Sequence, residues 1–279
     1  MLQLEIEQLF DSPPSQYTEE HRRIFEAFKA ALNRGEVRAA EPDAAAKTGW
    51  RVNAWVKKGI LLGFRIGKVV DMSVDRERQP FFDKDTYPPK AFGLASQVRI
   101  VPGGSSIRDG SYVGPSVTCM PPMFINAGAY VDEGTMVDSH ALIGSCAQVG
   151  RACHISAGAQ IGGVLEPVGA LPVIIEDEVM VGGNCGVYEG VVVKRRAVLG
   201  SGVILNGSTA VYDLVREQIY AATDCSPLVI PEEAVVVPGS RALSHPAGQR
   251  WNLSIYSPII IKYRDAKTNE RVQLESLFR

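Results

Sequence analysis

The sequence predicts a mainly β protein whose central part is a parallel β-helix of six-residue repeats. Three observations predict this fold. An aliphatic residue or a cysteine recurs at every sixth position through the middle of the chain, a turn-forming residue often follows it, and the flanking segments lack the period. Short strands joined by tight corners close into triangular coils, and such coils stack with their strands about 4.8 Å apart.

The repeat runs in two long blocks and one short one. Its positions are Val101, Ile107, Val113, Cys119, Ile125, Val131, Val137, Ile143, Val149, Ile155 and Ile161, then Ile175, Val181, Val187, Val193, Leu199, Leu205 and Val211, then Ile230 and Val236. Turn formers such as Asn126, Asp132 and Gly144 follow them and tolerate positive φ. A sandwich or barrel would instead show turn signals every 8–12 residues or so.

The interruptions and flanks divide the chain into three parts. We expect an α-rich domain over 1–98, the β-helix over 99–240 with a loop excursion at 163–174, and a strand and helix segment over 241–279. Apolar periodicity and capping residues place the elements of the flanks. The expected elements are helices at 18–35 and from Trp50 to about Leu62, a strand at 64–70, a proline-rich linker at 83–93, a strand at 254–264 and a helix at 271–279.

Composition excludes several classes of partner. The formal charge is −2, so no basic excess indicates a nucleic acid or an anionic membrane. No apolar run approaches the ~20 residues of a membrane span. The acidic start lacks the cationic region of a signal peptide. Five cysteines without a C-x-x-C pair indicate reduced thiols and a cytoplasmic protein.

A long motif carries a resemblance to a known family. The run GAYVDEGTMVDSHALIGSCAQVG at 128–150 resembles the signature of tetrahydrodipicolinate N-succinyltransferases, as do FRIG, FFDK, RIVP, IGGVLEP, IIED and KYRDAKT in the same order. The resemblance covers the chain from about residue 55 onward. It implies a left-handed β-helix and a homotrimer with its active sites between neighbouring chains. It also implies succinyl transfer from succinyl-CoA, with no permanently bound cofactor, to the amino group of hydrated tetrahydrodipicolinate in lysine biosynthesis.

The resemblance assigns Asp138 and Arg99 to the site. Asp138 matches the acidic position that binds substrate and acts in catalysis, since a carboxylate can orient an amine or accept its proton. Its spacing alone favours the role of a turn former. Arg99 matches a substrate-binding arginine, and a guanidinium binds a carboxylate of the dicarboxylate acceptor in a bidentate fork. The alternative for Arg99 is a solvated charge on the first coil.

The match fails at a second carboxylate. Related enzymes carry R-S-E where this chain has Asn184, Cys185 and Gly186. Glu189 and Glu166 are the nearest acids in sequence, so we consider Glu189 for catalysis and Glu166 for substrate binding. A solvent-facing Glu189 is the competing interpretation.

Other candidates concern metal and CoA. His140 and His154 are too few for the three-histidine zinc site that this fold can carry, so we expect no metal; His140 lies near Asp138 in sequence and is a possible base or an exposed side chain. CoA phosphates favour cations, and glycines allow close backbone approach. The CoA-binding candidates are Lys194, Arg195, Arg196, Lys262, Gly200 and Gly202, and the cations equally fit solvated charges and the glycines corners.

Two other functions stay open at this point. One is a related N-acyltransferase with an acetyl donor, because the sequence does not fix the length of the acyl group. The other is a non-catalytic β-helix that scaffolds a partner. A scaffold would need neither an arginine for a dicarboxylate nor a long loop beside a groove between chains.

Overall fold

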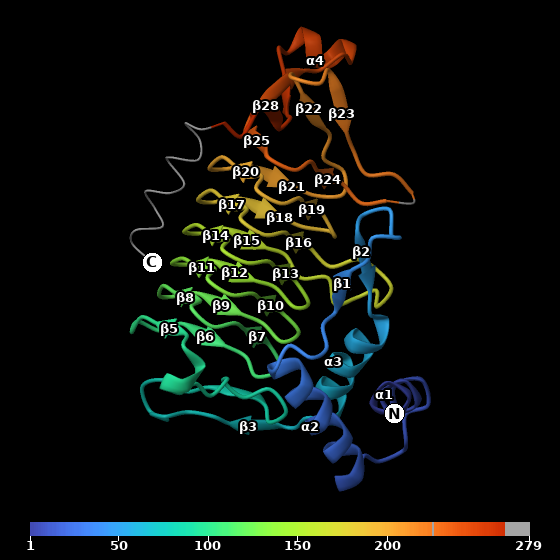
Figure 1. Cartoon of the computed structure of the whole chain (residues 1–279), viewed down its shortest axis with the longest axis vertical. Coiled ribbons are helices and arrows are strands. Elements are labelled where there is room, and N and C mark those ends of the chain that lie inside the picture. The colour runs from blue at the N-terminus through green and yellow to red at the C-terminus, as the bar shows by residue number, and fades with distance from the viewer. Residues whose placement is uncertain (225, 266–279) are drawn as a thin grey trace.

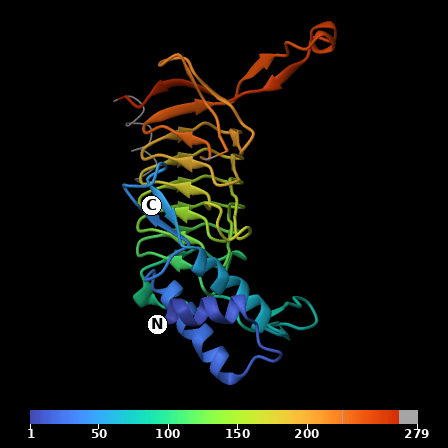
Figure 2. The same cartoon turned by 90° about the vertical axis from the view of Figure 1, so that its right-hand side faces the viewer.

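A left-handed parallel β-helix forms the centre of the protein, as predicted (Figure 1). The computed structural model describes residues 1–224 and 226–265. Each coil contributes one two-residue strand to each of three parallel sheets, which we call the first, second and third faces. Helices gather at the N-terminal end of the β-helix, and a hairpin arm extends from its other end (Figures 1 and 2).

The three faces are built from strands that lie 18 residues apart along most of the β-helix. The first face contains β5 (Arg99–Ile100), β8 (Thr118–Cys119), β11 (Met136–Val137), β14 (His154–Ile155), β17 (Met180–Val181) and β20 (Val198–Leu199). The second contains β6 (Ser106–Ile107), β9 (Phe124–Ile125), β12 (Leu142–Ile143), β15 (Gln160–Ile161), β18 (Gly186–Val187) and β21 (Ile204–Leu205). The third contains β7 (Tyr112–Val113), β10 (Tyr130–Val131), β13 (Gln148–Val149), β16 (Ile174–Ile175), β19 (Val192–Val193) and β24 (Val229–Ile230).

The predicted repeat positions fill the core. From Ile107 to Leu205 the second residue of each strand is buried in one hydrophobic cluster. Two positions were predicted wrongly. Ile100, not Val101, pairs with Cys119, because the first corner is one residue longer than the others. Val211 does not start another coil strand but begins β22 (Val211–Asp213), which pairs with β23 (Gln218–Tyr220) in an antiparallel hairpin.

The N-terminal domain is helical, with details that differ from prediction. It contains α1 (Leu2–Asp11), α2 (Glu19–Asn33), α3 (Ala54–Ile66), the 3-10 helix η1 (Leu94–Ser96) and the hairpins β1 (Ala40–Pro42)–β2 (Trp50–Val52) and β3 (Val69–Asp71)–β4 (Phe82–Lys84). Thr18 caps α2, as its sequence indicates. The helix expected from Trp50 starts later, because Trp50 belongs to β2. Of the strand expected at 64–70, residues 64–66 end α3 and only residues 69–70 are in a strand, β3.

The hairpin β1–β2 covers the third face of the β-helix. The Arg38 guanidinium lies 3.7 Å from the centre of the Tyr130 ring, and Arg38 Nε donates a hydrogen bond to Gln148 Oε1 at 2.8 Å. Ala40 packs with Ile174 and Val192 in a buried cluster. Figure 2 shows the hairpin along this side of the coils. This hairpin leaves the first and second faces uncovered, whereas β4 and Phe92 border the first coils of the second face.

The C-terminal segment contains more strands than predicted. β25 (Ala234–Val237) completes the first face, and β28 (Ile259–Tyr263) pairs with it in antiparallel orientation. Between them an arm of β26 (Ser240–Ala242), α4 (Pro246–Arg250) and β27 (Ser254–Tyr256) projects from the β-helix. The single strand expected at 254–264 is therefore two strands, and they break beside Pro258, which lacks an amide donor. The helix expected at 271–279 lies outside the described residues.

Candidate functional site

Most of the candidate residues lie on the edges where two faces meet, while Arg99 and Lys262 lie on strands of the first face. The first edge joins the first and second faces, the second edge joins the second and third, and the third edge joins the third and first. Asp138, Gly200 and Gly202 lie on the first edge, directly after first-face strands. Glu166 and Glu189 lie on the second edge, and Lys194 lies on the third. Within one chain, the predicted residues therefore lie in separate groups and do not form a single site.

Asp138 directly follows β11 and is partly exposed. Its Oδ1 accepts a hydrogen bond from Ser139 N at 2.7 Å, and its own amide donates to Ile155 O of the next coil. Oδ1 thus satisfies a corner amide and fixes the side chain. Oδ2 faces His154, whose Nε2 lies 4.0 Å away. The corner role and a chemical role are consequently compatible, because they use different oxygens.

His154 is the histidine that the structure places beside Asp138. It occupies the first-face position directly above Met136, and its side chain is only 13% exposed. His140, the histidine nearer in sequence, is exposed with φ of 62° in the corner. The stacking of residues 18 apart explains the difference, because His154 follows Met136 by one coil. The spacing of 18 residues between Met136 and His154, which is three repeats of six, is the signal in the sequence that indicates this neighbour.

Arg99 lies on the first face below Asp138. β5 pairs with β8 and β8 pairs with β11, so Arg99 is two strands, or about 10 Å, below Met136. Arg99 is exposed in the single chain. Its guanidinium has no ion pair or side-chain hydrogen bond with any residue that the structure describes. It is open to an anionic ligand on the same side of the molecule as Asp138.

Gly200 and Gly202 lie on the first edge above Asp138. Strands β11, β14, β17 and β20 are successive neighbours, so Gly200 is three strands, or about 14 Å, above Asp138. Gly202 has a φ of 79°, a corner conformation that favours glycine, so the corner alone accounts for this residue. Lys262 pairs with Val235 at the top of the first face, and its Nζ lies 3.0 Å from Asp265 Oδ2.

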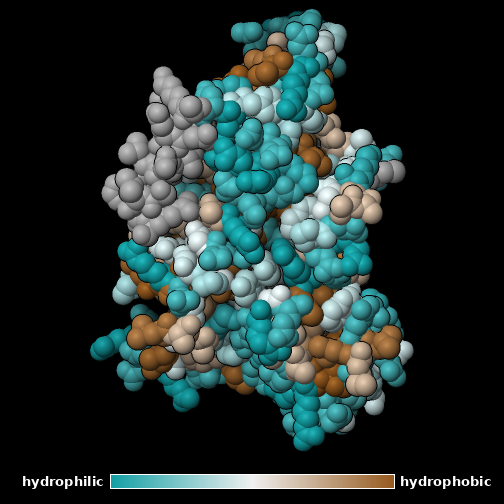
Figure 3. Space-filling view, viewed as in Figure 1, coloured by the Kyte–Doolittle hydropathy of each residue, from teal (hydrophilic) through white to brown (hydrophobic). Residues whose placement is uncertain are grey.

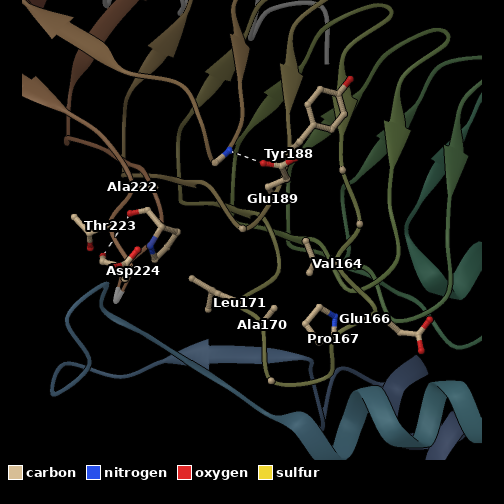
Figure 4. A pocket seen from close by; sticks show the side chains of 17 residues that line it. Val164, Glu166, Pro167, Ala170, Leu171, Tyr188, Glu189, Ala222, Thr223 and Asp224 are labelled. Carbon is tan, nitrogen blue, oxygen red and sulfur yellow. Dashed lines mark hydrogen bonds between the residues drawn. The ribbon is translucent and has the colours of Figure 1, made fainter.

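Glu166 and Glu189 line one pocket at the second edge. The loop at 162–173, the corner after β18 and the segment before β24 enclose about 870 Å³. Glu189 is exposed, and its Oε2 accepts a hydrogen bond from Gly207 N at 2.7 Å (Figure 4). Glu166 is also exposed and turns its carboxylate away from Glu189 (Figure 4). Within one chain, neither acid lies on the edge that carries Asp138.

The pocket loop is held by a buried lysine. The Lys57 side chain on α3 is fully buried, and its Nζ donates a hydrogen bond to Ala170 O at 2.5 Å. Burial lowers the pKa of this ammonium group below its ordinary value. Leu171 packs against the buried cluster of the third face. The loop is therefore fixed to the N-terminal domain at its C-terminal half, and sequence reasoning missed the lysine because it lies more than a hundred residues away.

We expect Lys57→Met to loosen this loop while the β-helix stays folded. The variant keeps the length and burial of the side chain but leaves Ala170 O without its donor, a loss that costs about 1–3 kcal/mol. Hydrogen exchange of peptides spanning 162–173 should become faster. Lys58→Met, which removes the neighbouring lysine that pairs with Asp11 at the surface, is the control. Unchanged exchange in the Lys57 variant would contradict the anchoring role.

The third edge carries cations that already have anionic partners. Lys194 Nζ lies 2.7 Å from Glu176 Oε1 and also donates to Thr48 O at 2.7 Å. Arg195 and Arg196 pair with Glu178 at 2.7 and 3.0 Å. The hydrogen bond from Arg195 holds the pKa of Glu178 below its ordinary value. The contact of these cations with CoA stays a prediction. Of the four candidate cations, Lys194, Arg195, Arg196 and Lys262, only Lys262 lies in a strand of the first face, which borders the edge that carries Asp138.

The described residues contain no group of three or more histidine, cysteine, aspartate or glutamate side chains that could hold a metal ion. In the same part of the chain, no helix combines the length and apolar character that crossing a membrane requires.

Family profiles match two parts of the chain, one in the N-terminal domain and one in the later coils of the β-helix. Residues 1–66 match the profile described as tetrahydrodipicolinate N-succinyltransferase N-terminal. Residues 172–206 match the profile described as hexapeptide repeat of succinyl-transferase. The first match includes part of the chain for which the sequence motifs gave no resemblance.

Similar proteins cover nearly the whole chain. A 2,3,4,5-tetrahydropyridine-2,6-dicarboxylate N-succinyltransferase of Xylella fastidiosa is 42% identical over 89% of this chain and 85% of its own length. One of the same name from Polynucleobacter asymbioticus is 39% identical over 92% of this chain and 90% of its own. A crystal structure from Campylobacter jejuni, described as a tetrahydropyridine-carboxylate N-succinyltransferase, is 17% identical with a TM-score of 0.50. The match spans 90% of this chain but only 64% of that one, and it supports the fold alone.

Proposed function

Since the chain belongs to the tetrahydrodipicolinate N-succinyltransferase family, we propose that it moves the succinyl group of succinyl-CoA to the amino group of hydrated tetrahydrodipicolinate. The observation that supports this most is the order of residues along one side of the molecule. Arg99, Asp138 and Gly200 follow one another up the first face and its edge. In this arrangement Arg99 can bind an anionic acceptor and Asp138 can accept its proton, while Gly200 leaves room beside the edge for CoA.

Each residue has a role in the proposed reaction. Arg99 binds a carboxylate of the acceptor, and the corner holds Asp138 so that Oδ2 accepts a proton from the attacking amine. The amine nitrogen forms a bond to the thioester carbon, the carbon–sulfur bond breaks, and CoA leaves. The extended arm of CoA lies along the first edge toward Gly200 and Gly202, and Lys262 is a cation at that end of the first face.

We propose that the site is completed by a second chain. Asp138 and the pocket with Glu166 and Glu189 lie on different edges of one chain, so in the proposed assembly the second edge or second face of a neighbour meets Asp138. A contact between unlike faces is head to tail, and such contacts form a ring when the rotation between subunits closes. The family resemblance indicates a ring of three.

The uncovered faces support this assembly. Partly exposed apolar residues point outward from both, including Met180 and Val198 on the first face and Phe124, Leu142 and Ile204 on the second. Figure 3 shows hydrophobic surface over the first coils and near α4. Apolar side chains exposed along a face are typical of a contact between subunits.

We further propose that the enzyme acts in the diaminopimelate branch of lysine biosynthesis in the cytoplasm. The four cysteines that the structure describes, Cys119, Cys146, Cys153 and Cys185, are buried thiols, which is typical of reducing compartments.

An assay of thiol release tests the proposed activity. The purified chain should release CoA from succinyl-CoA only when tetrahydrodipicolinate is present, and mass spectrometry should find the acceptor heavier by one succinyl group. A parallel reaction with acetyl-CoA tests the other acyl donor. Thiol release from acetyl-CoA alone, or none from either donor, would contradict the proposal.

A further inference from the structure

Two uncharged polar side chains lie at mid-height on the second face and its edge. The outward positions of this face pass from Ser106 through Phe124 and Leu142 to Gln160, then to Gly186 and Ile204, and Tyr188 follows β18 at the second edge. Gln160 and the nearby Tyr188 are partly exposed. Neither side chain forms a hydrogen bond with any residue in the described part of the chain. We call Gln160 and Tyr188 the second-face polar pair.

Two glycines hold the Tyr188 ring flat on this face. A Cβ atom at Gly186 would lie 2.5 Å from Tyr188 Cε2 and 2.8 Å from its hydroxyl oxygen, and one at Gly162 would lie 2.7 Å from Tyr188 Cδ1. Cβ atoms essentially never come within 3.0 Å of such atoms, so only glycine leaves room for the ring at both positions. The ring therefore occupies the place where a side chain at 186 would lie.

Tyr188 is one of the residues that line the pocket at the second edge, but its hydroxyl group points away from the pocket loop. Figure 4 shows Tyr188 with its ring apart from Val164, Ala170 and Thr223 and its oxygen turned from the loop. The phenol is thus presented on the second face, where Gln160 lies one strand below Gly186. Both members of the polar pair carry a hydrogen-bond donor, and neither carries a charge.

The height of the polar pair matches the gap between Asp138 and Gly200. Gln160 belongs to the coil directly above that of Asp138, Gly186 to the next, and Gly200 to the one after. In a ring whose axis runs parallel to the β-helices, equal coils of neighbouring chains lie at equal height. The neighbour's polar pair then faces the space where the proposed function places the acyl group.

We propose that Gln160 and Tyr188 of one chain bind the terminal carboxylate of the succinyl group whose CoA lies on the next chain. This inference rests on the proposed function. Succinyl differs from an apolar acyl group of the same length by that carboxylate. Donors fixed on an apolar face reject an acyl group that leaves them unpaired, which makes hydrogen-bonding sites strongly selective.

Dissociation constants of two acyl-CoAs test this role without the reaction. Succinyl-CoA and butyryl-CoA have four-carbon acyl groups, and only the first has a terminal carboxylate. In calorimetric titrations without acceptor, the natural protein should prefer succinyl-CoA. Tyr188→Phe and Gln160→Leu should each reduce that preference by about tenfold or more, since a hydrogen bond to a charged group is lost. Tyr17→Phe, a hydroxyl removed in the N-terminal domain, should leave it unchanged.

The outcomes separate this inference from the proposed function. A preference that is unchanged in both variants would overturn the carboxylate-binding role, and so would an equal weakening of both ligands, which would assign the pair to the shared thioester or CoA portion. In either case the natural protein would still release CoA in the presence of tetrahydrodipicolinate. If the natural protein lacked that activity, the proposed function itself would fail.

Discussion

Asp138→Asn is expected to lower kcat/KM by at least about a hundredfold while the chain stays folded. A positioned base contributes about 10²–10⁴ in rate, and an amide cannot accept the amine proton. Asparagine preserves the corner, because its side-chain oxygen can still accept the hydrogen bond that Ser139 N donates to Oδ1. Steady-state kinetics with succinyl-CoA and tetrahydrodipicolinate measure the loss, and circular dichroism checks the fold.

Asp132→Asn is the matched control for this prediction. Asp132 lies in the corner one repeat earlier, and its Oδ1 accepts a hydrogen bond from Glu133 N at 2.8 Å, as Asp138 does from Ser139. It lies on the third edge and should leave kcat/KM within a few-fold. Glu189→Gln and Glu166→Gln test whether either acid supplies a second carboxylate. A folded Asp138→Asn enzyme with nearly natural activity would leave Asp138 with a corner role only.

Arg99→Ala is expected to raise KM for tetrahydrodipicolinate far more than KM for succinyl-CoA. Removing one partner of a hydrogen-bonded charge pair that the complex buries costs about 2–5 kcal/mol, or about 30-fold to several thousand-fold. Arg99 is open in the single chain, so the variant removes no contact that the described fold needs. Separate titration of each substrate measures the two constants.

Arg151→Ala controls for the loss of a surface arginine. Arg151 is exposed on the third edge and lies 3.5 Å from Asp132. Its removal should change neither KM appreciably, because exposed ion pairs contribute little. An Arg99→Ala enzyme that loses affinity equally for both substrates would contradict the proposed contact with the acceptor.

The repeat was predictable because one local rule is repeated in every coil. From Ile107 to Leu205 each sixth residue, apart from the excursion at 162–173, must fill the same interior column, so the pattern survives in the sequence. The N-terminal domain has no such redundancy. Trp50 reads as a helix residue by its apolar neighbours, but it forms a strand because it packs on the third face and donates a hydrogen bond to Glu176. That contact spans 126 residues, and no local pattern records it.

The candidate site was predictable where a motif identified it. The resemblance identified Asp138 and Arg99. The structure places Arg99 on the first face and Asp138 on the first edge, which borders that face. Tyr188 gave no signal, because its position depends on the space that Gly162 and Gly186 leave. Lys194 looked available in sequence, but folding places Glu176 beside it. Side chains that meet across coils or domains are set by the three-dimensional register, which single residues do not reveal.

The central claim is that succinyl transfer takes place between two chains, with Asp138 from one of them. A crystal structure with CoA and the succinylated product measures this directly. We predict a ring of three chains in which each product lies near Asp138 and Arg99 of one chain and near Gln160 and Tyr188 of its neighbour. A product bound entirely within one chain, or one that lies away from Asp138, would contradict the account.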